Sequence, residues 1–522
     1  MSPAPWSSSP APPAGAADGV FHPIAIRQRH VKDDAVLRVL FVTPECAPLA
    51  KVGGLGDVSA ALPVALREAG VDARLLIPGY PGVIASLASR RPSARMRAFE
   101  PPLELQLLED RLPTGVPLYA IEHAPLYDRA GDPYQNPQRE DWTDNALRFG
   151  VLCRVAATLG GAESPLAWRP HVVHLNDWPG GLAAAYLHYS RTPRAATLFT
   201  AHNLAFQGNY DPELRARLAL PPESYAPEGL EFHGQLSFLK AGLHYADALS
   251  TVSPTYAREI RTEPFGAGMH GLLEKRREVL HGILNGIDTE AWNPATDPYL
   301  PVHYSAARLE GKREVKRALQ ARLGLPPAPE GEPLLGLVGR LTHQKGIDLV
   351  IDIAGEIAGL AQLAILGVGA PQHEDALRTL ATRFPERIAV VIGFDEALAH
   401  LIEGGADLFL MPSRFEPCGL NQMYSARYGT PPVAHATGGL VDTIVDCTNA
   451  TLAQETATGF LFDQPTPAAL RAAIGRALAV YRTPSAWRAL QRSGMTRDFS
   501  WAGPARQYAA LYRRLARRSD PA

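Results

Sequence analysis

The pattern of apolar and polar residues divides most of the chain into two series of short strands, with helical patterns between them. Apolar runs of strand length occur first at 39–42, 73–77, 118–121, 171–175 and 197–201. A second series occurs at 334–339, 363–367, 388–392 and 408–411. Strands that alternate with helices build parallel sheets with helices on both faces. The pattern therefore predicts an α/β protein with two doubly wound parallel-sheet domains.

A helical region at about 236–280 and the turn-rich segment 284–301 separate the two series, and we interpret this segment as the domain junction. Near the C-terminus, an amphipathic pattern over about 504–518 predicts a helix whose apolar stripe contains Tyr508, Leu511, Tyr512 and Leu515. The predicted division is a disordered tail (1–35), an N-terminal Rossmann-like domain (36–283), a C-terminal Rossmann-like domain (284–500) and a C-terminal helix with a short tail (501–522).

The first 35 residues are rich in Pro, Ala and Ser, and a segment of this composition buries too little apolar surface to order itself. The stretch lacks the apolar core of a secretory signal, and it lacks the arginines of a transit peptide until Arg27 and Arg29. We therefore predict a disordered tail.

The composition excludes several classes of partner. The chain has 522 residues, of which 46% are hydrophobic and 20% charged, as in globular enzymes, and its net charge of −2 gives no electrostatic basis for binding nucleic acid or an anionic membrane. No apolar run is long enough to span a bilayer. Four scattered cysteines without metal-like spacing favour a reduced, cytoplasmic setting.

The stretch 38–58, RVLFVTPECAPLAKVGGLGDV, reads as a buried strand, a glycine loop and a helix start. Backbone N–H groups at Gly53 and Gly54, next to the charge of Lys51, favour an anion at this point. The glycines form neither the dinucleotide fingerprint nor a Walker A motif. The alternative is a tight strand-to-helix turn with an exposed lysine.

The second domain carries a matching set of groups. Arg340 and Lys345 follow a predicted strand end in RLTHQKG, and Glu416 follows another strand end in SRFEPCGL. The alternatives are solvated loop charges for the two cations and a helix cap for the carboxylate. Gly438 and Gly439 repeat the glycine arrangement before another helix.

Cations and helix N-termini that converge on one cleft favour a doubly charged ligand such as a diphosphate. The chain contains no Asp-x-Asp, the carboxylate pair with which metal-using sugar-nucleotide enzymes commonly hold their ion. The interpretation is that fixed cations, with no metal, stabilise the leaving diphosphate.

Several long motifs resemble those of bacterial glycogen synthase and plant starch synthase, from about residue 37 to 515: KVGGLGDV, FTAHNLAFQG, LKAGLHYADALSTVSPTYAREI, GILNGIDTEAWNPATDPYLP, GRLTHQKGIDLV and SRFEPCGLNQMYSARYGTPP. The resemblance implies the GT-B fold, in which two Rossmann-like domains face each other across a cleft and the last helix crosses back to the first domain. It implies a retaining transferase that moves glucose from ADP-glucose to the non-reducing end of an α-1,4-glucan such as glycogen, without a cofactor.

Position by position, the resemblance implies catalytic roles for Lys345 and Arg340 at the diphosphate, Glu416 at the sugar, His202 near the glucosyl hydroxyls and Asp57 near the acceptor. It implies donor binding by Lys51, Gly53, Gly54, Asn285, Phe394, Cys418, Gly419, Leu420, Thr437, Gly438 and Gly439. Phe394 is expected to stack on the adenine. From the residues alone, the favoured interpretation of His202 is a satisfied core histidine at a strand end.

The chain departs from the family pattern at a few positions. Asn176-Asp177-Trp178 stands where relatives usually have His-Asp-Trp, and Tyr424 stands where related retaining transferases have a second glutamate, as is normal for glycogen synthases. Two other functions remain as alternatives: a GT-B transferase that makes a small product from UDP-glucose, and a glucan-binding protein with an inactive site.

Overall fold

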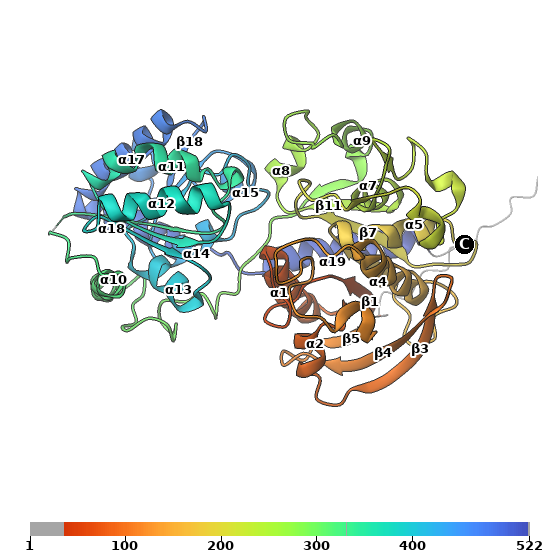
Figure 1. Cartoon of the computed structure of the whole chain (residues 1–522). Coiled ribbons are helices and arrows are strands. Elements are labelled where there is room, and N and C mark those ends of the chain that lie inside the picture. The colour runs from red at the N-terminus through yellow and green to blue at the C-terminus, as the bar shows by residue number, and fades with distance from the viewer. Residues whose placement is uncertain (1–35, 330, 520–522) are drawn as a thin grey trace, which may run out of the picture.

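The computed structural model describes residues 36–329 and 331–519, which form two lobes side by side (Figure 1). The predicted tail, 1–35, lies outside the described residues. Each lobe is built around its own β-sheet, and helices cover both faces of each sheet. Among the described residues, no helix combines the length and the apolar character that crossing a membrane requires.

The first lobe contains a nine-stranded sheet in the order β12-β11-β7-β6-β1-β2-β5-β4-β3. Its strands are β1 (Leu37–Val42), β2 (Val71–Pro78), β3 (Arg91–Ala98), β4 (Leu103–Arg111), β5 (Pro117–Glu122), β6 (Val172–Asn176), β7 (Ala196–Ala201), β11 (Ala248–Thr251) and β12 (Leu280–Gly282). All five strands of the first predicted series are present. The sequence pattern missed β3 and β4, which pair antiparallel at the edge. The edge strand β3 is mostly solvent-accessible, so it has no continuous apolar run.

Helices cover both faces of this sheet. Helix α1 (Gly54–Glu68) packs against α19 (Ala502–Ser519) on one face, and α4 (Asn145–Gly160), α5 (Leu182–His188) and α7 (Phe238–Tyr245) pack in a row on the other. Shorter elements complete the lobe: α2 (Pro81–Ser86), α3 (Ala124–Tyr127), α6 (Leu214–Arg217), α8 (Pro254–Glu259), α9 (His270–Lys275) and a small sheet of β8 (Asn209–Tyr210), β10 (Gln235–Ser237) and β9 (Glu231–Phe232).

The second lobe contains a six-stranded, fully parallel sheet in the order β15-β14-β13-β16-β17-β18. Its strands are β13 (Leu334–Val338), β14 (Gln362–Gly367), β15 (Ile388–Ile392), β16 (Leu408–Met411), β17 (Pro432–His435) and β18 (Phe460–Phe462). Its helices are α10 (Glu310–Leu323), α11 (Ile347–Ala358), α12 (Pro371–Arg383), α13 (Glu396–Gly405), α14 (Asn421–Arg427), α15 (Gly438–Thr443), α16 (Asn449–Ala453), α17 (Pro467–Tyr481) and α18 (Pro484–Met495).

Alternate residues of the second sheet enter two separate cores. Leu335 and Leu337 pack with α11 and α17, whereas Leu334 and Phe409 pack with α10 and α13. Successive strand residues point to opposite faces, so a strand that is apolar on both faces needs helices on both sides. The predicted fold, two doubly wound α/β domains, is confirmed.

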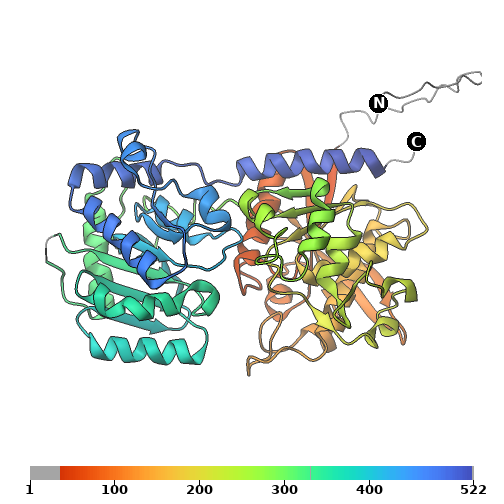
Figure 2. The same cartoon turned by 90° about the horizontal axis from the view of Figure 1, so that it is seen from above.

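Helix α19 returns from the second lobe and lies along the first lobe (Figure 2). Ile287 and Ser500 form a parallel bridge where the chain passes between the lobes in both directions. Tyr508 and Tyr512 of α19 are buried, and the Tyr512 hydroxyl lies 2.7 Å from Nδ1 of His174 on β6. The apolar stripe predicted for this helix therefore anchors it to the first lobe. The domain limits that we propose, after residues 283 and 500, lie beside this bridge.

Candidate active site between the lobes

A cavity of about 190 Å³ lies where the carboxyl ends of β1, β13 and β16 meet. Its lining comes from both lobes and consists of Val52 and Gly53 from the first lobe and Leu337, Val338, Gly339, Arg340, Lys345, Ile347, Leu410, Met411, Ser413, Gly419, Leu420 and Asn421 from the second. In open α/β sheets, ligands bind outside the carboxyl ends of the strands. Five of the predicted site residues line this one cavity.

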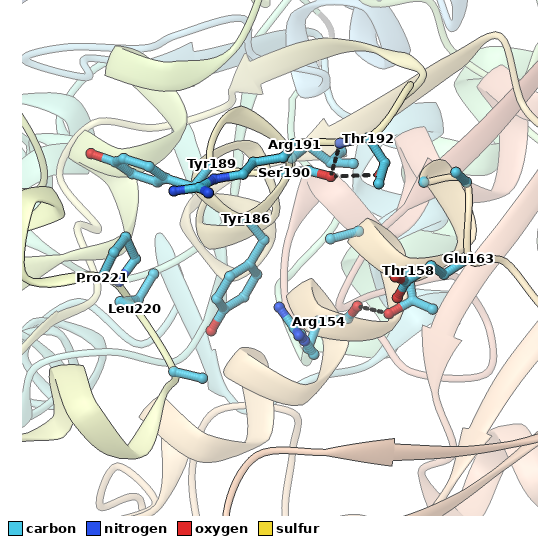
Figure 3. Close-up of a pocket in the computed structure, with 15 residues that line it drawn as sticks. Arg154, Thr158, Glu163, Tyr186, Tyr189, Ser190, Arg191, Thr192, Leu220 and Pro221 are labelled. Atoms are coloured by element: carbon cyan, nitrogen blue, oxygen red, sulfur yellow. Dashed lines mark hydrogen bonds between the residues drawn. The ribbon is translucent and has the colours of Figure 1, made fainter.

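A larger cavity, of about 470 Å³, lies on the first lobe (Figure 3). It is lined by the ends of α4 and α5, where Arg154 lies over the Tyr186 ring at 5.3 Å. Both helices end here before the chain enters β6 and β7, so this cavity lies at the amino edge of the sheet, opposite the strand ends that carry ligands. None of the predicted site residues lines it.

Lys345, which lines the second-lobe side of the cavity, forms an ion pair with Glu416. Lys345 Nζ lies 2.5 Å from Glu416 Oε2, and Ser413 Oγ donates to the same oxygen at 2.9 Å. Glu416 is 6% exposed. Gly346, at φ +68°, lets the loop that carries Lys345 pass close to Pro412. A Cβ at position 346 would lie 2.1 Å from the carbonyl oxygen of Pro412. A buried charge without its partner is costly, so each group depends on the other.

The interpretation of Glu416 as a helix cap is wrong. The following helix, α14, begins at Asn421, and Leu420 occupies its N-cap position. The carboxylate of Glu416 is bound instead by Lys345 and Ser413. Glu416 does not line the cavity itself but is held by two residues that do, Lys345 and Ser413.

Arg340 is the exposed cation on the same side of the cavity. Its guanidinium lies 5.7 Å from the centre of the Phe206 ring of the first lobe and donates to Gln344 Oε1 at 3.3 Å. Within residues 36–329 and 331–519, no carboxylate forms an ion pair with it. A cation with no counterion at the edge of a cavity is free to bind an anionic ligand.

The glycine loop after β1 already holds an anion. Glu45 Oε2 accepts hydrogen bonds from the backbone N–H groups of Val52 (2.7 Å) and Gly53 (3.0 Å), and Tyr134 donates to Glu45 Oε1 at 2.6 Å. Burial raises the pKa of Glu45 although these hydrogen bonds oppose it. The predicted anion at this loop is therefore a carboxylate of the same lobe, and Gly53 offers no free N–H in this arrangement.

Lys51 is likewise paired within its own lobe. Its ammonium lies 2.8 Å from Asp57 Oδ1, in the first turn of α1, which begins at Gly54. Burial raises the pKa of Asp57, and Lys51 opposes this effect. Lys51 does not line the 190 Å³ cavity. The donor role of Lys51 stays a prediction that requires it to exchange Asp57 for a ligand.

His202 follows β7 and is fixed by a neighbouring strand. Its Nε2 lies 3.0 Å from Asn176 Oδ1 at the end of β6. Burial lowers the pKa of His202 to about 3, so the ring is neutral at physiological pH. His202 is therefore a polar, uncharged group at the end of a strand, and its contact with the glucosyl group stays a prediction.

Asp177, next to Asn176 at the end of β6, is not among the predicted site residues, but its geometry is unusual. It has φ +57° and ψ −179°, a backbone conformation that residues other than glycine rarely adopt. Its Oδ1 has no hydrogen-bond partner among the described residues. Burial raises its pKa to about 8, although backbone N–H groups of Trp178, His202 and Asn203 oppose this. Its place directly after a buried strand was the signal available.

The residues around Cys418 form the back of the site. Burial raises the pKa of the Cys418 thiol to about 12, so this group is not an anionic nucleophile. Asn285 is buried, its backbone N–H lies against Cys418, and its side-chain Oδ1 has no partner within the described chain. Phe394 is 81% exposed and does not line the cavity. Its stacking role stays a prediction.

Helices α8 and α15 of opposite lobes cap each other, and we call this contact the clasp. Glu259, which ends α8, accepts from Gly438 N at 2.9 Å and Thr437 Oγ1 at 3.1 Å at the start of α15. Asp442 of α15 accepts from the backbone N–H and the hydroxyl of Thr255 in α8, both at 2.8 Å. Thr437 and Gly438, two predicted donor-binding residues, are therefore engaged by a first-lobe carboxylate.

Gly439 is the third residue of the predicted phosphate loop. Its N–H donates to the carbonyl oxygen of Glu416 at 3.1 Å, and it packs directly on Cys418. The loop is thus joined to the Lys345–Glu416 pair. Among the described residues, no group of three or more His, Cys, Asp or Glu side chains is arranged to hold a metal ion.

Two facing lobes, each built on a wholly or largely parallel sheet, with a cavity at their strand ends are typical of a glycosyltransferase of the GT-B class. Residues 38–275 match the family model described as starch synthase catalytic domain, and residues 326–492 match the model described as glycosyl transferases group 1. Over 479 residues, 92% of this chain and 97% of that protein, the chain is 57% identical to the glycogen synthase of Aromatoleum aromaticum. The chain belongs to the glycogen synthase and starch synthase family.

Other relatives agree with this assignment. The glycogen synthase of Nitrosomonas eutropha is 54% identical over 493 residues, 93% of this chain and 98% of that protein. The catalytic domain of starch synthase IV from Arabidopsis thaliana, solved with ADP and acarbose, has a TM-score of 0.82 at 31% identity and covers 92% of this chain and 100% of its own. A sucrose-phosphate synthase from Thermosynechococcus elongatus, at 20% identity and a TM-score of 0.57, is similar in fold.

Proposed function

We propose that this chain transfers glucose from ADP-glucose to the 4-hydroxyl at the non-reducing end of an α-1,4-glucan such as glycogen, in the cytoplasm and with retention of configuration. The observation that carries the proposal is the second-lobe side of the cavity, which is lined by Arg340, without an ion-pair partner among the described residues, and by Lys345 of the Lys345–Glu416 pair. The starch synthase IV structure that resembles this chain was solved with ADP and acarbose, a nucleotide and a saccharide. The four cysteines are free and buried, as in a protein of a reducing compartment.

The cations supply the electrostatic part of the mechanism. As the bond between glucosyl C1 and the diphosphate oxygen breaks, negative charge develops on the diphosphate, and Arg340 and Lys345 stabilise it where water is excluded. Glu416, held against Lys345, faces the sugar and supports the positive charge that develops at C1. Closure of the lobes lets Lys51 exchange Asp57 for a phosphate oxygen. No metal ion is required in this scheme, because fixed side chains carry the positive charge.

Retention follows from transfer on one face of the sugar. The acceptor 4-oxygen forms its bond to C1 on the face that the diphosphate leaves, and its proton passes to the departing phosphate oxygen. Tyr424 occupies the position where related retaining transferases have a second carboxylate, and the Cys418 thiol stays protonated. The mechanism therefore needs no covalent enzyme intermediate.

The test is ADP release from ADP-glucose, with UDP-glucose as the competing donor, each with and without glycogen and with EDTA present. We expect glycogen-dependent ADP release and incorporation of labelled glucose into polymer. Absence of polymer labelling with either donor refutes the function. Labelling from UDP-glucose alone refutes the donor, and a strict requirement for a divalent ion refutes the metal-free scheme.

A further inference from the structure

A chain of hydrogen bonds runs from β1 through Asn176 to His202. Asn176 is fully buried at the end of β6, and its Nδ2 donates to the carbonyl oxygen of Val42 at 3.0 Å. Its Oδ1 lies 3.0 Å from His202 Nε2. The imidazole Nδ1 forms no hydrogen bond with any described residue.

The direction of each hydrogen bond follows from the groups involved. A backbone carbonyl oxygen only accepts, so the amide nitrogen of Asn176 must face Val42. The amide oxygen then faces His202, and it also only accepts. The imidazole Nε2 must therefore carry a proton, which leaves two states: a neutral ring with a bare Nδ1, or an imidazolium.

The surroundings select the neutral ring. Burial disfavours the imidazolium, and neutral His174 on β6, whose pKa burial also lowers, gives it no compensating charge. Asp177 approaches the backbone N–H of His202, but burial keeps this carboxyl protonated at neutral pH. No ionised carboxylate is in contact with the ring in the described chain.

We propose that Asn176 is a positioning residue that fixes His202 as the neutral tautomer protonated at Nε2. Nδ1 then points its lone pair to the cleft and accepts a hydrogen bond from a sugar hydroxyl; this second step rests on the proposed function. An amide neither gains nor loses a proton, so the tautomer is the same at every working pH. A histidine at position 176 lacks this property, because it titrates and has two tautomers of its own.

Nitrogen NMR of protein labelled with ¹⁵N-histidine tests the first step without reference to activity. The His202 signals are assigned by their loss in His202→Gln. We expect wild-type His202 to show protonated Nε2 and bare Nδ1 throughout pH 5.5–8.5. A protonated Nδ1, or titration of the ring within this range, overturns the proposal, and this measurement decides even if no Asn176 variant folds.

Asn176→Leu keeps the volume of the side chain and removes the acceptor. We expect His202 to become a mixture of both tautomers and kcat/KM for ADP-glucose to fall roughly tenfold, mainly through kcat. The matched control is Gln362→Leu, at the amino end of β14 in the second lobe. This change removes another buried amide, which donates to the carbonyl oxygen of Pro326 and accepts from the side chain of Gln320. We expect it to leave the His202 spectrum unchanged. An unchanged tautomer in Asn176→Leu contradicts the positioning role, whereas a fixed tautomer without transferase activity contradicts only the proposed function.

Discussion

Around the glycine loop of the first lobe the charged groups are paired within the lobe, whereas the second lobe carries a cation that a ligand can use. Lys51 is paired with Asp57, Glu45 occupies the glycine loop, and His202 is neutral. In the second lobe, Arg340 has no counterion in the described chain, and Lys345 forms an ion pair with the buried Glu416. The difference supports the proposal that cations of the second lobe hold the diphosphate, whereas Lys51 of the first lobe must exchange Asp57 before it can bind a phosphate oxygen.

The largest effect is expected from Lys345→Ala. The change removes a cation from the developing charge and leaves Glu416 buried without its partner, so kcat should fall roughly 100- to 1,000-fold. Initial rates of ADP release at saturating ADP-glucose measure this. A fall of less than tenfold contradicts the electrostatic role.

Lys316→Ala is the matched control for Lys345→Ala. Lys316 Nζ lies 2.7 Å from Asp407 Oδ2 in a pair of similar burial, but at the amino edge of the second sheet, away from the cleft. This variant should lose stability and retain kcat within about twofold. If it lost as much activity as Lys345→Ala, the comparison would measure folding rather than catalysis.

A smaller effect is expected from the clasp. Glu259→Gln and Asp442→Asn keep the shape of each contact but remove its charge, so the lobes should be held together less firmly. Each variant should lower kcat/KM for ADP-glucose about fivefold and increase the radius of gyration measured by small-angle X-ray scattering. Glu278→Gln, on the exposed side chain paired with Arg277, is the control and should do neither.

One outcome would contradict the role of the clasp in holding the lobes together. Thr437 and Gly438 are also predicted phosphate contacts, so the carboxylate of Glu259 occupies a place where a donor phosphate is expected. If Glu259→Gln bound ADP-glucose more tightly than the wild type, Glu259 would be a competitor of the donor and not a tie between the lobes.

The smallest effect is expected from Asp177→Asn, which should change the pH dependence of thermal stability. The folded pKa of Asp177, about 8, lies above the usual 3.8, so between pH 4 and pH 8 the unfolded chain is ionised while the folded chain keeps the proton. This group therefore costs stability as pH rises through that window. Asp177→Asn does not titrate, so its Tm should exceed that of the wild type by a margin that grows from pH 5 to pH 8.

Asp247→Asn should change the pH dependence of stability in the opposite direction. Burial favours the neutral form of Asp247, but the hydrogen bonds and charge of Arg194, with Thr197, outweigh it and hold the pKa below 3.8. This group contributes stability above pH 4, so the variant should have a lower Tm than the wild type at pH 7 and a smaller deficit near pH 3. A Tm difference for Asp177→Asn that did not change with pH would contradict the raised pKa.

The second lobe was the easier half to predict from the sequence. Strands that are buried on both faces are continuous apolar runs, and 388–392 and 408–411 coincide with β15 and β16. Cations directly after such strands must lie at one edge of the sheet, which is why Arg340 and Lys345 were found. Their partner Glu416 was found too, but its pairing with Lys345 was not, because it joins loops 71 residues apart.

The first lobe was harder to predict from the sequence. Strand β11 has only four residues and lies in a segment predicted as helical, and β3 is an exposed edge strand. The occupation of the glycine loop by Glu45 depends on the path of the loop in space, which residue spacing does not reveal. Asp177 was passed over because neither its positive φ nor its burial can be read from its neighbours in the chain.

Calorimetric titration of ADP in the presence of EDTA tests the central claim most directly, with the wild type, Arg340→Ala, Lys345→Ala and the double variant. Each charge-assisted contact is worth roughly 1.5–3 kcal/mol, so each single change should weaken binding at least tenfold and the double change should weaken it further. Binding by the wild type only when a divalent ion is added, or equal affinity in all four proteins, would contradict a diphosphate held by the second-lobe cations.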